Sequence, residues 1–153
     1  MNMSYGRYFE ELRPGETFRH RPGRTINEYD DTLLSLLCMN QHPVHIDEHY
    51  ARATQHGRRL VAGPTVISIV IGMTQGDVGG RAVETLSYAD VRHAAPVFHG
   101  DTLYAESTVV RTEALPGGRG SVVVETRATN QKQEMVLSLT RKIIVPSNAK
   151  GEK

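Results

Sequence analysis

The stretch GPTVISIVIGMTQGD, residues 63–77, decides the fold. It opens with a glycine and then a proline, which is favoured at the start of a helix. Its apolar side chains fall on nearly every face, and several are β-branched, which by itself favours a strand. The proline start and the length of the stretch nevertheless favour a helix. We therefore predict a helix buried on all sides over 63–77, with a buried strand as the alternative.

Beyond Gly79 and Gly80 the pattern becomes strand-like, with apolar and polar residues alternating clearly in the last three of four runs. Pro116-Gly117-Gly118 and Gln131-Lys132-Gln133 separate three of the runs and are short enough for antiparallel hairpins. The predicted strands are 17–26, 85–91, 102–112, 121–130 and 135–145. We expect an α+β fold in which an antiparallel sheet wraps around the central helix.

Length and composition bound the classes of function. The 153 residues suffice for one domain, with a core over about 8–145 and a disordered tail over 146–153. A net charge of +1 and an aromatic content of 6% argue against a nucleic-acid partner. We see no leader peptide and no membrane-length apolar run, so we expect a cytoplasmic protein. Cys38, the single cysteine, lies among leucines and is expected to be a buried, inert thiol.

The segment NQHPVHID, residues 40–47, concentrates proton-handling side chains and follows an apolar run of helical spacing. That run, 33–37, belongs to a predicted helix with Asn27 as its N-cap. Pro43 cannot continue this helix and holds His42 outside the α region, so we expect an extended turn over 42–45. A second helix is predicted from Asp47 to about residue 57.

Two residues of this segment have competing interpretations. Asp47 is better explained as the cap of the second helix than as a catalytic carboxylate. His45 is open to either reading, because a histidine in a turn can simply bond a carbonyl, while neutral imidazole is also the commonest proton acceptor near pH 7. His42, His45 and His49 have a spacing that a metal site would use on one helix, but Pro43 interrupts that helix, so we expect no metal.

The order of an Asn-x-x-Pro-x-His-x-Asp turn, a glycine-initiated apolar helix and the block PVFHGDTL, residues 96–103, resembles the MaoC-like hydratases. The resemblance covers about 8–145. It implies the hot-dog fold, a bent antiparallel sheet around a central helix, with two copies joined as a dimer or a higher homo-oligomer. It further implies an acyl-coenzyme A thioester as substrate, with no other cofactor.

Carried over residue by residue, the resemblance places His45 on the family's catalytic histidine. Asn40 falls where (R)-specific enoyl-CoA hydratases carry a catalytic aspartate, and His42 replaces the asparagine before the proline. An amide can orient a water molecule but cannot take its proton. The Met39-Asn40 start of the turn resembles MaoC-like proteins assigned to branched C5 dicarboxylyl-CoA substrates such as itaconyl-CoA or mesaconyl-CoA.

Hydration of an α,β-unsaturated thioester needs a base for water, a proton for the α-carbon, and donors to the thioester oxygen. We assign the first role to His45. The backbone N–H groups near Gly63, at the positive end of the buried helix, suit the third. The alternative is that Gly63 serves only to allow a tight helix entry. A single water can supply both hydroxyl and proton if His45 shuttles the proton while Asn40 holds the water. Asp31 and Asp47 are the alternative carboxylates for this proton transfer.

Basic residues add candidates for substrate binding. Arg58 and Arg59 precede the buried helix and can grip coenzyme A phosphates or a substrate carboxylate, although exposed arginines are more often only solvated. Arg92 and His93 lie between two predicted strands and are within reach of a ligand, but sequence does not set their direction. Asp101, in Gly100-Asp101-Thr102, is expected to shape a turn.

The sequence therefore predicts an acyl-CoA hydratase/dehydratase that uses His45 and Asn40, with Gly63, Asp47, Arg58 and Arg59 against the substrate. Two rivals remain open. The same fold supports a thioesterase, in which His45 or Asp47 activates water against the carbonyl carbon. The absence of the family aspartate at Asn40 fits a non-catalytic acyl-CoA-binding partner subunit, and fold alone does not choose among the three.

Overall fold

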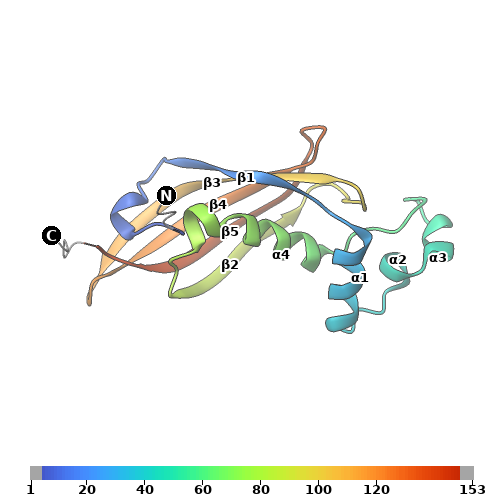
Figure 1. Cartoon of the computed structure of the whole chain (residues 1–153), viewed down its shortest axis with the longest axis horizontal. Helices are drawn as coiled ribbons and strands as arrows, with labels where there is room; N and C mark the ends of the chain where they lie inside the picture. The colour runs from blue at the N-terminus through green and yellow to red at the C-terminus, as the bar shows by residue number, and fades with distance from the viewer. Residues whose placement is uncertain (1–4, 149–153) are drawn as a thin grey trace.

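Five strands form one antiparallel sheet in the computed structural model, which describes residues 5–148 (Figure 1). The sheet order is β1-β3-β4-β5-β2, so β1 and β2 are the two edges. The strands are β1 (Thr17–Thr25), β2 (Glu84–His93), β3 (Thr102–Leu115), β4 (Arg119–Thr129) and β5 (Met135–Pro146). The five predicted strands are confirmed, and each differs from its predicted bounds by three residues or fewer.

Both predicted hairpins are present. The β3–β4 turn contains Gly117 and Gly118, whose φ angles of +80° and +68° lie in the left-handed region that glycine enters at little cost. The β4–β5 turn is held by Asn130, whose side-chain oxygen accepts the N–H groups of Lys132 and Glu134 at 2.9 and 3.1 Å. Asp101 shapes its turn as expected, because its carboxylate accepts the Phe98 N–H at 2.9 Å.

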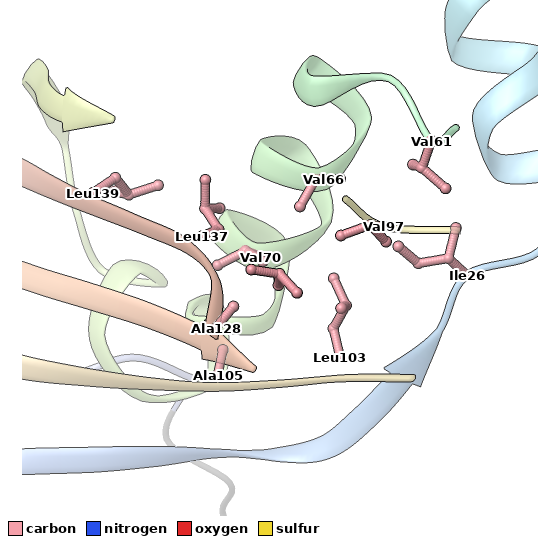
Figure 2. Close-up of a cluster of buried hydrophobic side chains, with 11 residues drawn as sticks. Ile26, Val61, Val66, Val70, Val97, Leu103, Ala105, Ala128, Leu137 and Leu139 are labelled. Atoms are coloured by element: carbon pink, nitrogen blue, oxygen red, sulfur yellow. The ribbon is translucent and has the colours of Figure 1, made fainter. Parts of the chain in front are cut away.

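The central helix is α4 (Gly63–Met73), which lies along the inner face of the sheet. Figure 2 shows Val66 and Val70 of α4 facing Leu103 and Leu137 of the sheet, and all four side chains are buried. The helix prediction is confirmed and the strand alternative is wrong. Burial of these side chains supplies the main driving force for folding.

Two details of the central helix differ from the prediction. Its α-helical part ends at Met73, and the chain continues as a π-helical turn, η2 (Gln75–Gly79). The helix is also not buried on all sides, since one face is exposed. That face carries residues four apart, Pro64, Ser68, Gly72 and Gly76. The sheet covers only one side of α4, so within the described chain the opposite side has no covering layer.

A charged group closes the far end of α4. Arg141 of β5 is buried, and its guanidinium donates to the hydroxyl of Thr74, the C-cap of α4, at 3.0 Å. Burial lowers the pKa of Arg141, and the nearby Tyr88 acts in the opposite direction. A cation at a helix C-terminus interacts favourably with the negative end of the helix dipole.

The helices before α4 gather at one end of the sheet, opposite the end where β5 finishes at Pro146 (Figure 1). They are α1 (Glu28–Leu37), α2 (Pro43–Ile46) and α3 (Glu48–Arg52), and a short 3-10 turn, η1 (Phe9–Glu11), precedes β1. Asn27 is the N-cap of α1 as predicted, and its N–H donates to Asp30 at 2.8 Å.

Two predictions about this end were wrong. The segment 42–45 is not extended throughout: His42 is extended, with ψ at 120°, but Pro43 begins the helical turn α2. Proline removes an N–H that the first residue of a helix does not need, so it starts a new helix as readily as it ends the old one. The helix after Asp47 ends at Arg52, before the predicted end near residue 57.

The outer face of α1 is apolar and uncovered. Cys38 is exposed, contrary to the prediction of a buried thiol, and its apolar neighbours Leu36, Leu37 and Met39 are exposed as well. No helix within residues 5–148 is long and apolar enough to cross a membrane.

The chain remains ordered past the point where we expected a disordered tail. Pro146 is the last residue of β5, Ser147 N–H donates to Gly118 O at 2.8 Å, and Asn148 N–H donates to Glu10 at 3.0 Å. These contacts also lower the pKa of the Glu10 carboxyl, with the Ser147 hydroxyl as the largest cause. The rest of the expected tail, 149–153, lies outside the described residues.

A buried polar chain ties η2 to the sheet. Asp77 bonds His20 Nδ1 at 2.9 Å, His20 Nε2 bonds the Ser107 hydroxyl at 2.8 Å, and Ser107 bonds the Thr126 hydroxyl at 2.8 Å. His20, Ser107 and Thr126 are all buried. A carboxylate accepts, so Nδ1 donates to Asp77, and in the neutral ring Nε2 accepts the Ser107 hydrogen. This chain of hydrogen bonds gives partners to buried polar side chains that water cannot reach.

Removing Ser107 should therefore destabilise the fold. Ser107→Ala leaves His20 Nε2 and the Thr126 hydroxyl without their partner, and we expect a loss of about 1–3 kcal/mol in the free energy of unfolding by urea. The neighbouring Thr108→Ser, at a half-buried position on the other face of β3, should change it by less than about 0.5 kcal/mol. Equal effects of the two substitutions would contradict a structural role for the buried chain.

Candidate active site

The turn α2 presents His45. Pro43 occupies the first turn of α2, and the Nδ1 atom of His42 accepts the Val44 N–H at 3.2 Å, which caps the turn. Asp47 ends α2 and caps α3, where its carboxylate accepts the Tyr50 N–H at 2.9 Å. His45 is thus held in a single helical turn that is fixed at both ends.

The tautomer of His45 follows from its partner. His45 Nδ1 lies 2.9 Å from the carbonyl oxygen of Leu60. A carbonyl oxygen can only accept, so Nδ1 carries the hydrogen, and Nε2 of the neutral ring keeps its lone pair. His45 is half-buried, and among the described residues nothing hydrogen-bonds to Nε2. This ring has the geometry of a general base.

Leu60 is itself fixed from two sides. Its N–H donates to Val44 O at 3.1 Å, and it forms an isolated β-bridge with Phe98. The next residue, Val61, donates to Val97 O at 2.9 Å. The PVF part of the block 96–103 therefore holds the segment that orients His45.

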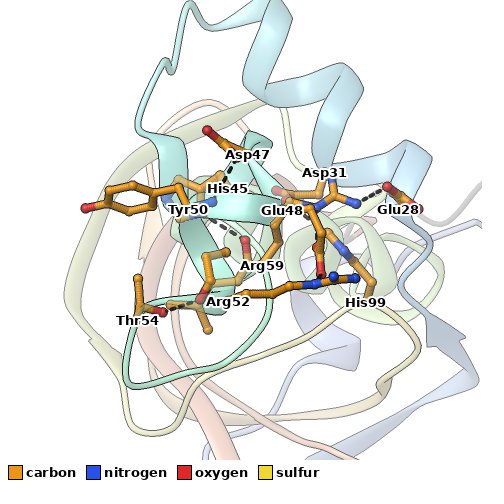
Figure 3. Close-up of polar contacts among 12 residues, drawn as sticks. Glu28, Asp31, His45, Asp47, Glu48, Tyr50, Arg52, Thr54, Arg59 and His99 are labelled. Atoms are coloured by element: carbon orange, nitrogen blue, oxygen red, sulfur yellow. Dashed lines mark hydrogen bonds and ion pairs between the residues drawn. The ribbon is translucent and has the colours of Figure 1, made fainter.

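Asp31 of α1 connects the elements around the site (Figure 3). It is completely buried. One carboxylate oxygen accepts the Ala62 N–H at 2.9 Å and the Thr65 hydroxyl at 3.0 Å, while the other lies 3.1 Å from His99 Nε2. A carboxylate next to a helix N-terminus is also favoured by the helix dipole. Asp31 thus joins α1, the start of α4 and the block 96–103.

Gly63 begins α4, and its N–H has no hydrogen-bond partner within residues 5–148. The amide lies at the positive end of the helix and can donate to an anion. Leu60, which orients His45, precedes Gly63 by three residues, so their Cα atoms are at most about 11 Å apart. The residue that orients the base and the anion donor therefore belong to one short segment.

Asn40 lies at the start of the turn, half-buried. Its side-chain oxygen accepts the His42 N–H at 3.2 Å, which leaves the NH₂ group to donate. The ring of His42 lies 5.8 Å from the ring of His45, centroid to centroid. Asn40 is therefore joined to the histidine pair through the backbone of His42.

Comparison with known proteins identifies the family. The MaoC like domain family matches residues 9–132. This chain belongs to the MaoC-like family. The mesaconyl-CoA hydratase of Cereibacter sphaeroides is 38% identical over 95% of this chain, which spans only 43% of that protein. The (R)-specific enoyl-CoA hydratase of Rhodospirillum rubrum is 31% identical over 80% of this chain and 89% of that protein.

The fold assignment agrees with solved structures. A Mycobacterium tuberculosis protein described as having a double hot-dog fold superposes with a TM-score of 0.86 at 22% identity, covering 97% of this chain and 46% of that one. The predicted hot-dog fold is confirmed. The chain corresponds to one of two such units in that protein, and it spans less than half of the mesaconyl-CoA hydratase.

Two other predicted site residues of this MaoC-like domain have structural partners of their own. Asp47 is exposed and bonds its own helix. Arg59 is held by ion pairs to Glu28 and to Glu48, the latter at 3.1 Å, and its side chain is only 13% exposed. These contacts fix the loop before α4 (Figure 3).

Arg58 remains available to a ligand. It is exposed, and its guanidinium stacks 3.8 Å from the centroid of the Phe98 ring. Its role in binding coenzyme A stays a prediction. Within the described part of the chain no group of three or more His, Cys, Asp or Glu residues is arranged to hold a metal.

The structure also places one residue whose direction the sequence left open. A methyl group added to Gly63 would lie 2.9 Å from Nε2 of His93, the last residue of β2. The ring of His93 therefore faces the start of α4. Strand alternation alone does not predict this, because the neighbour of an edge strand's end is set by the tertiary fold.

Asp31 should prove far more important for stability than Asp47, although both are aspartates at helix N-termini. Asp31→Ala leaves the Ala62 N–H and His99 without their buried partner, and we expect a loss of about 3–5 kcal/mol in the free energy of unfolding. Asp47→Ala removes an exposed cap and should cost about 1 kcal/mol. Urea denaturation of both variants measures this, and comparable losses would refute the anchoring role of Asp31.

Proposed function

We propose that this MaoC-like domain hydrates a short branched or dicarboxylic enoyl-CoA, of the mesaconyl-CoA or itaconyl-CoA type, and catalyses the reverse dehydration. The observation that carries the proposal is the hydrogen bond from His45 Nδ1 to the carbonyl oxygen of Leu60. It leaves Nε2 free to act as a base, and it ties His45 to the segment that leads to Gly63. The reaction needs only water and the thioester.

The proposed reaction follows from these groups. Water attacks the β-carbon and gives a proton to His45 Nε2, while the alkene electron pair moves through the α-carbon onto the thioester oxygen. The Gly63 N–H stabilises the negative charge on that oxygen. The enolate then takes a proton at the α-carbon from His45, which returns to its neutral form. The NH₂ group of Asn40 holds the water in line, since it has a free donor but cannot accept the proton.

The substrate class rests on similarity. The relative with 38% identity is named a mesaconyl-CoA hydratase, and the Rhodospirillum relative is named an (R)-specific enoyl-CoA hydratase. Both names describe addition of water to an enoyl thioester. We assign the exposed Arg58 to the coenzyme A phosphates or to a substrate carboxylate, because a guanidinium forms charge-assisted hydrogen bonds with either group.

One assay separates hydration from its rivals. The protein is incubated with crotonyl-, itaconyl- and mesaconyl-CoA, and enoyl absorbance and free thiol are followed separately. Loss of absorbance without thiol supports hydration, most strongly on the C5 dicarboxylyl thioesters. Release of thiol would instead show a thioesterase. Binding without either reaction would show an acyl-CoA-binding subunit and defeat the proposal.

His45 should be essential for turnover. We expect His45→Ala to lower kcat by about 10²-fold or more through loss of the general base, with the fold retained. His49→Ala, in the exposed helix α3, is the matched control and should keep nearly full activity. Enoyl absorbance gives kcat, and circular dichroism checks the fold. Near-wild-type turnover in His45→Ala would remove His45 from the mechanism.

We also propose that the domain associates with a second hot-dog unit through β2. Every residue of β2 is exposed, although the strand is long and pairs on one side with β5. Large apolar side chains are exposed on it or next to it, namely Val83, Leu86, Tyr88 and Val91. An open edge with apolar side chains is a site for pairing with another chain.

A charge on this edge should weaken the association. We expect the wild-type chain to be at least a dimer at micromolar concentration, and Leu86→Lys to shift it towards the monomer, because lysine is costly at a paired edge. Val110→Lys, at an exposed apolar position of β3, should leave the mass unchanged. Light scattering after size exclusion measures both. A wild-type monomer would contradict pairing of two copies.

A further inference from the structure

His93 occupies a specific position over the start of α4. A methyl group on Gly63 would lie 2.9 Å from His93 Nε2 and 3.2 Å from Cε1, so this edge of the imidazole faces the Gly63 backbone. The ring has no hydrogen-bond partner among residues 5–148, and the residue is exposed. The side chain is therefore accessible and unpaired at the point where α4 begins.

The backbone around His93 fixes its direction. His93 pairs with Leu137 of β5, and the following Ala94 N–H donates to Val136 O at 3.0 Å. Side chains of directly paired residues lie on the same face of a sheet, and Leu137 points into the core against α4. His93 therefore points to the inner face, whereas its neighbour Arg92, paired with Ser138, points to the outer face.

The N-terminus of α4 offers few donors for the thioester oxygen. The Ala62 N–H is taken by Asp31 at 2.9 Å, and Pro64 has no N–H. The Gly63 N–H has no partner within residues 5–148, and Gly63 is the residue of this turn that lies next to His93. Oxyanion sites commonly combine several preorganised donors, and the loss of one costs about 10²–10³-fold in kcat.

We propose that His93 donates a hydrogen bond from Nε2 to the thioester oxygen, beside the Gly63 N–H, and so completes the oxyanion site. The assignment rests on the proposed function. It explains why position 63 is glycine, since a side chain there would strike the His93 ring, which contributes the second donor. A neutral imidazole suffices for this role, because it can carry its hydrogen on Nε2.

Three substitutions at position 93 separate hydrogen bonding from packing. His93→Gln keeps an N–H donor, His93→Phe keeps a ring without a donor, and His93→Ala removes both. We expect kcat for hydration to fall by about 10²-fold in His93→Phe and His93→Ala, with KM little changed, and by less than about 10-fold in His93→Gln. His49→Phe, at an exposed position of α3, is the control and should keep the wild-type rate. Full activity in His93→Phe would overturn the proposal.

A second readout does not need turnover. A saturated thioester labelled with ¹³C at its carbonyl is bound to the protein, and the carbonyl stretch is measured by infrared difference spectroscopy. Donors to the oxygen lower the frequency of the carbonyl stretch, so we expect a smaller shift in His93→Phe than in wild type or His93→Gln.

The outcomes separate the oxyanion assignment from the proposed function. If wild type does not hydrate enoyl-CoA but the shift still depends on His93, the oxyanion assignment stands and the proposed function fails. If wild type hydrates and neither readout responds to His93→Phe, only the assignment fails. A wild-type protein without a shifted carbonyl overturns the assignment.

Discussion

The buried carboxylate of Asp31 is the constraint on which the arrangement of the site depends. A charge without access to water is costly unless hydrogen bonds compensate it, and Asp31 has three such contacts, to Ala62, Thr65 and His99. These partners come from different parts of the chain, so satisfying one carboxylate aligns α1, the start of α4 and the block 96–103. The position of the Gly63 amide follows from that alignment.

A second hydrogen bond, between His45 and Leu60, orients the proposed base relative to this alignment. Leu60 lies on the segment that enters α4, and its carbonyl oxygen selects the tautomer of His45. The same residue bonds Val44 of α2 through its N–H, so helix entry and base are fixed by one peptide segment. Preorganised groups of this kind do not have to reorganise as the reaction proceeds, which is why their contribution to catalysis is large. The faces of β2, α1 and α4 around this segment include exposed residues, and the proposed second hot-dog unit would cover β2.

Patterns within short stretches predicted the fold well. The hairpins at Gly117-Gly118 and at 131–133, the cap at Asn27 and the cap at Asp47 were all read from local signals and are confirmed. Errors arose where a residue has two structural uses or where the environment decides. The sequence pattern predicts that Pro43 ends a helix, but Pro43 also starts α2. The leucines around Cys38 predict a buried thiol, but Cys38 is exposed. Helical spacing does not reveal which apolar face of a helix packs against the sheet.

The chemistry of the site was predictable only in part. The motif identified His45 and Asn40, and the resemblance to the family gave them roles, which remain predictions. The sequence did not reveal that Asp31 bonds the start of α4, that Arg59 is held by two glutamates, or that His93 faces Gly63, because all three depend on contacts between distant segments.

The state of the His45 ring tests the central claim most directly. The protein has seven histidines, so ¹⁵N-labelled wild type and His45→Gln would be compared by NMR to assign the ring of residue 45. At a pH where the imidazole is neutral, the account predicts a protonated Nδ1 and an unprotonated Nε2. A neutral ring with its hydrogen on Nε2 would contradict it, because that tautomer neither bonds the Leu60 carbonyl nor accepts a proton from water at the position of the proposed base.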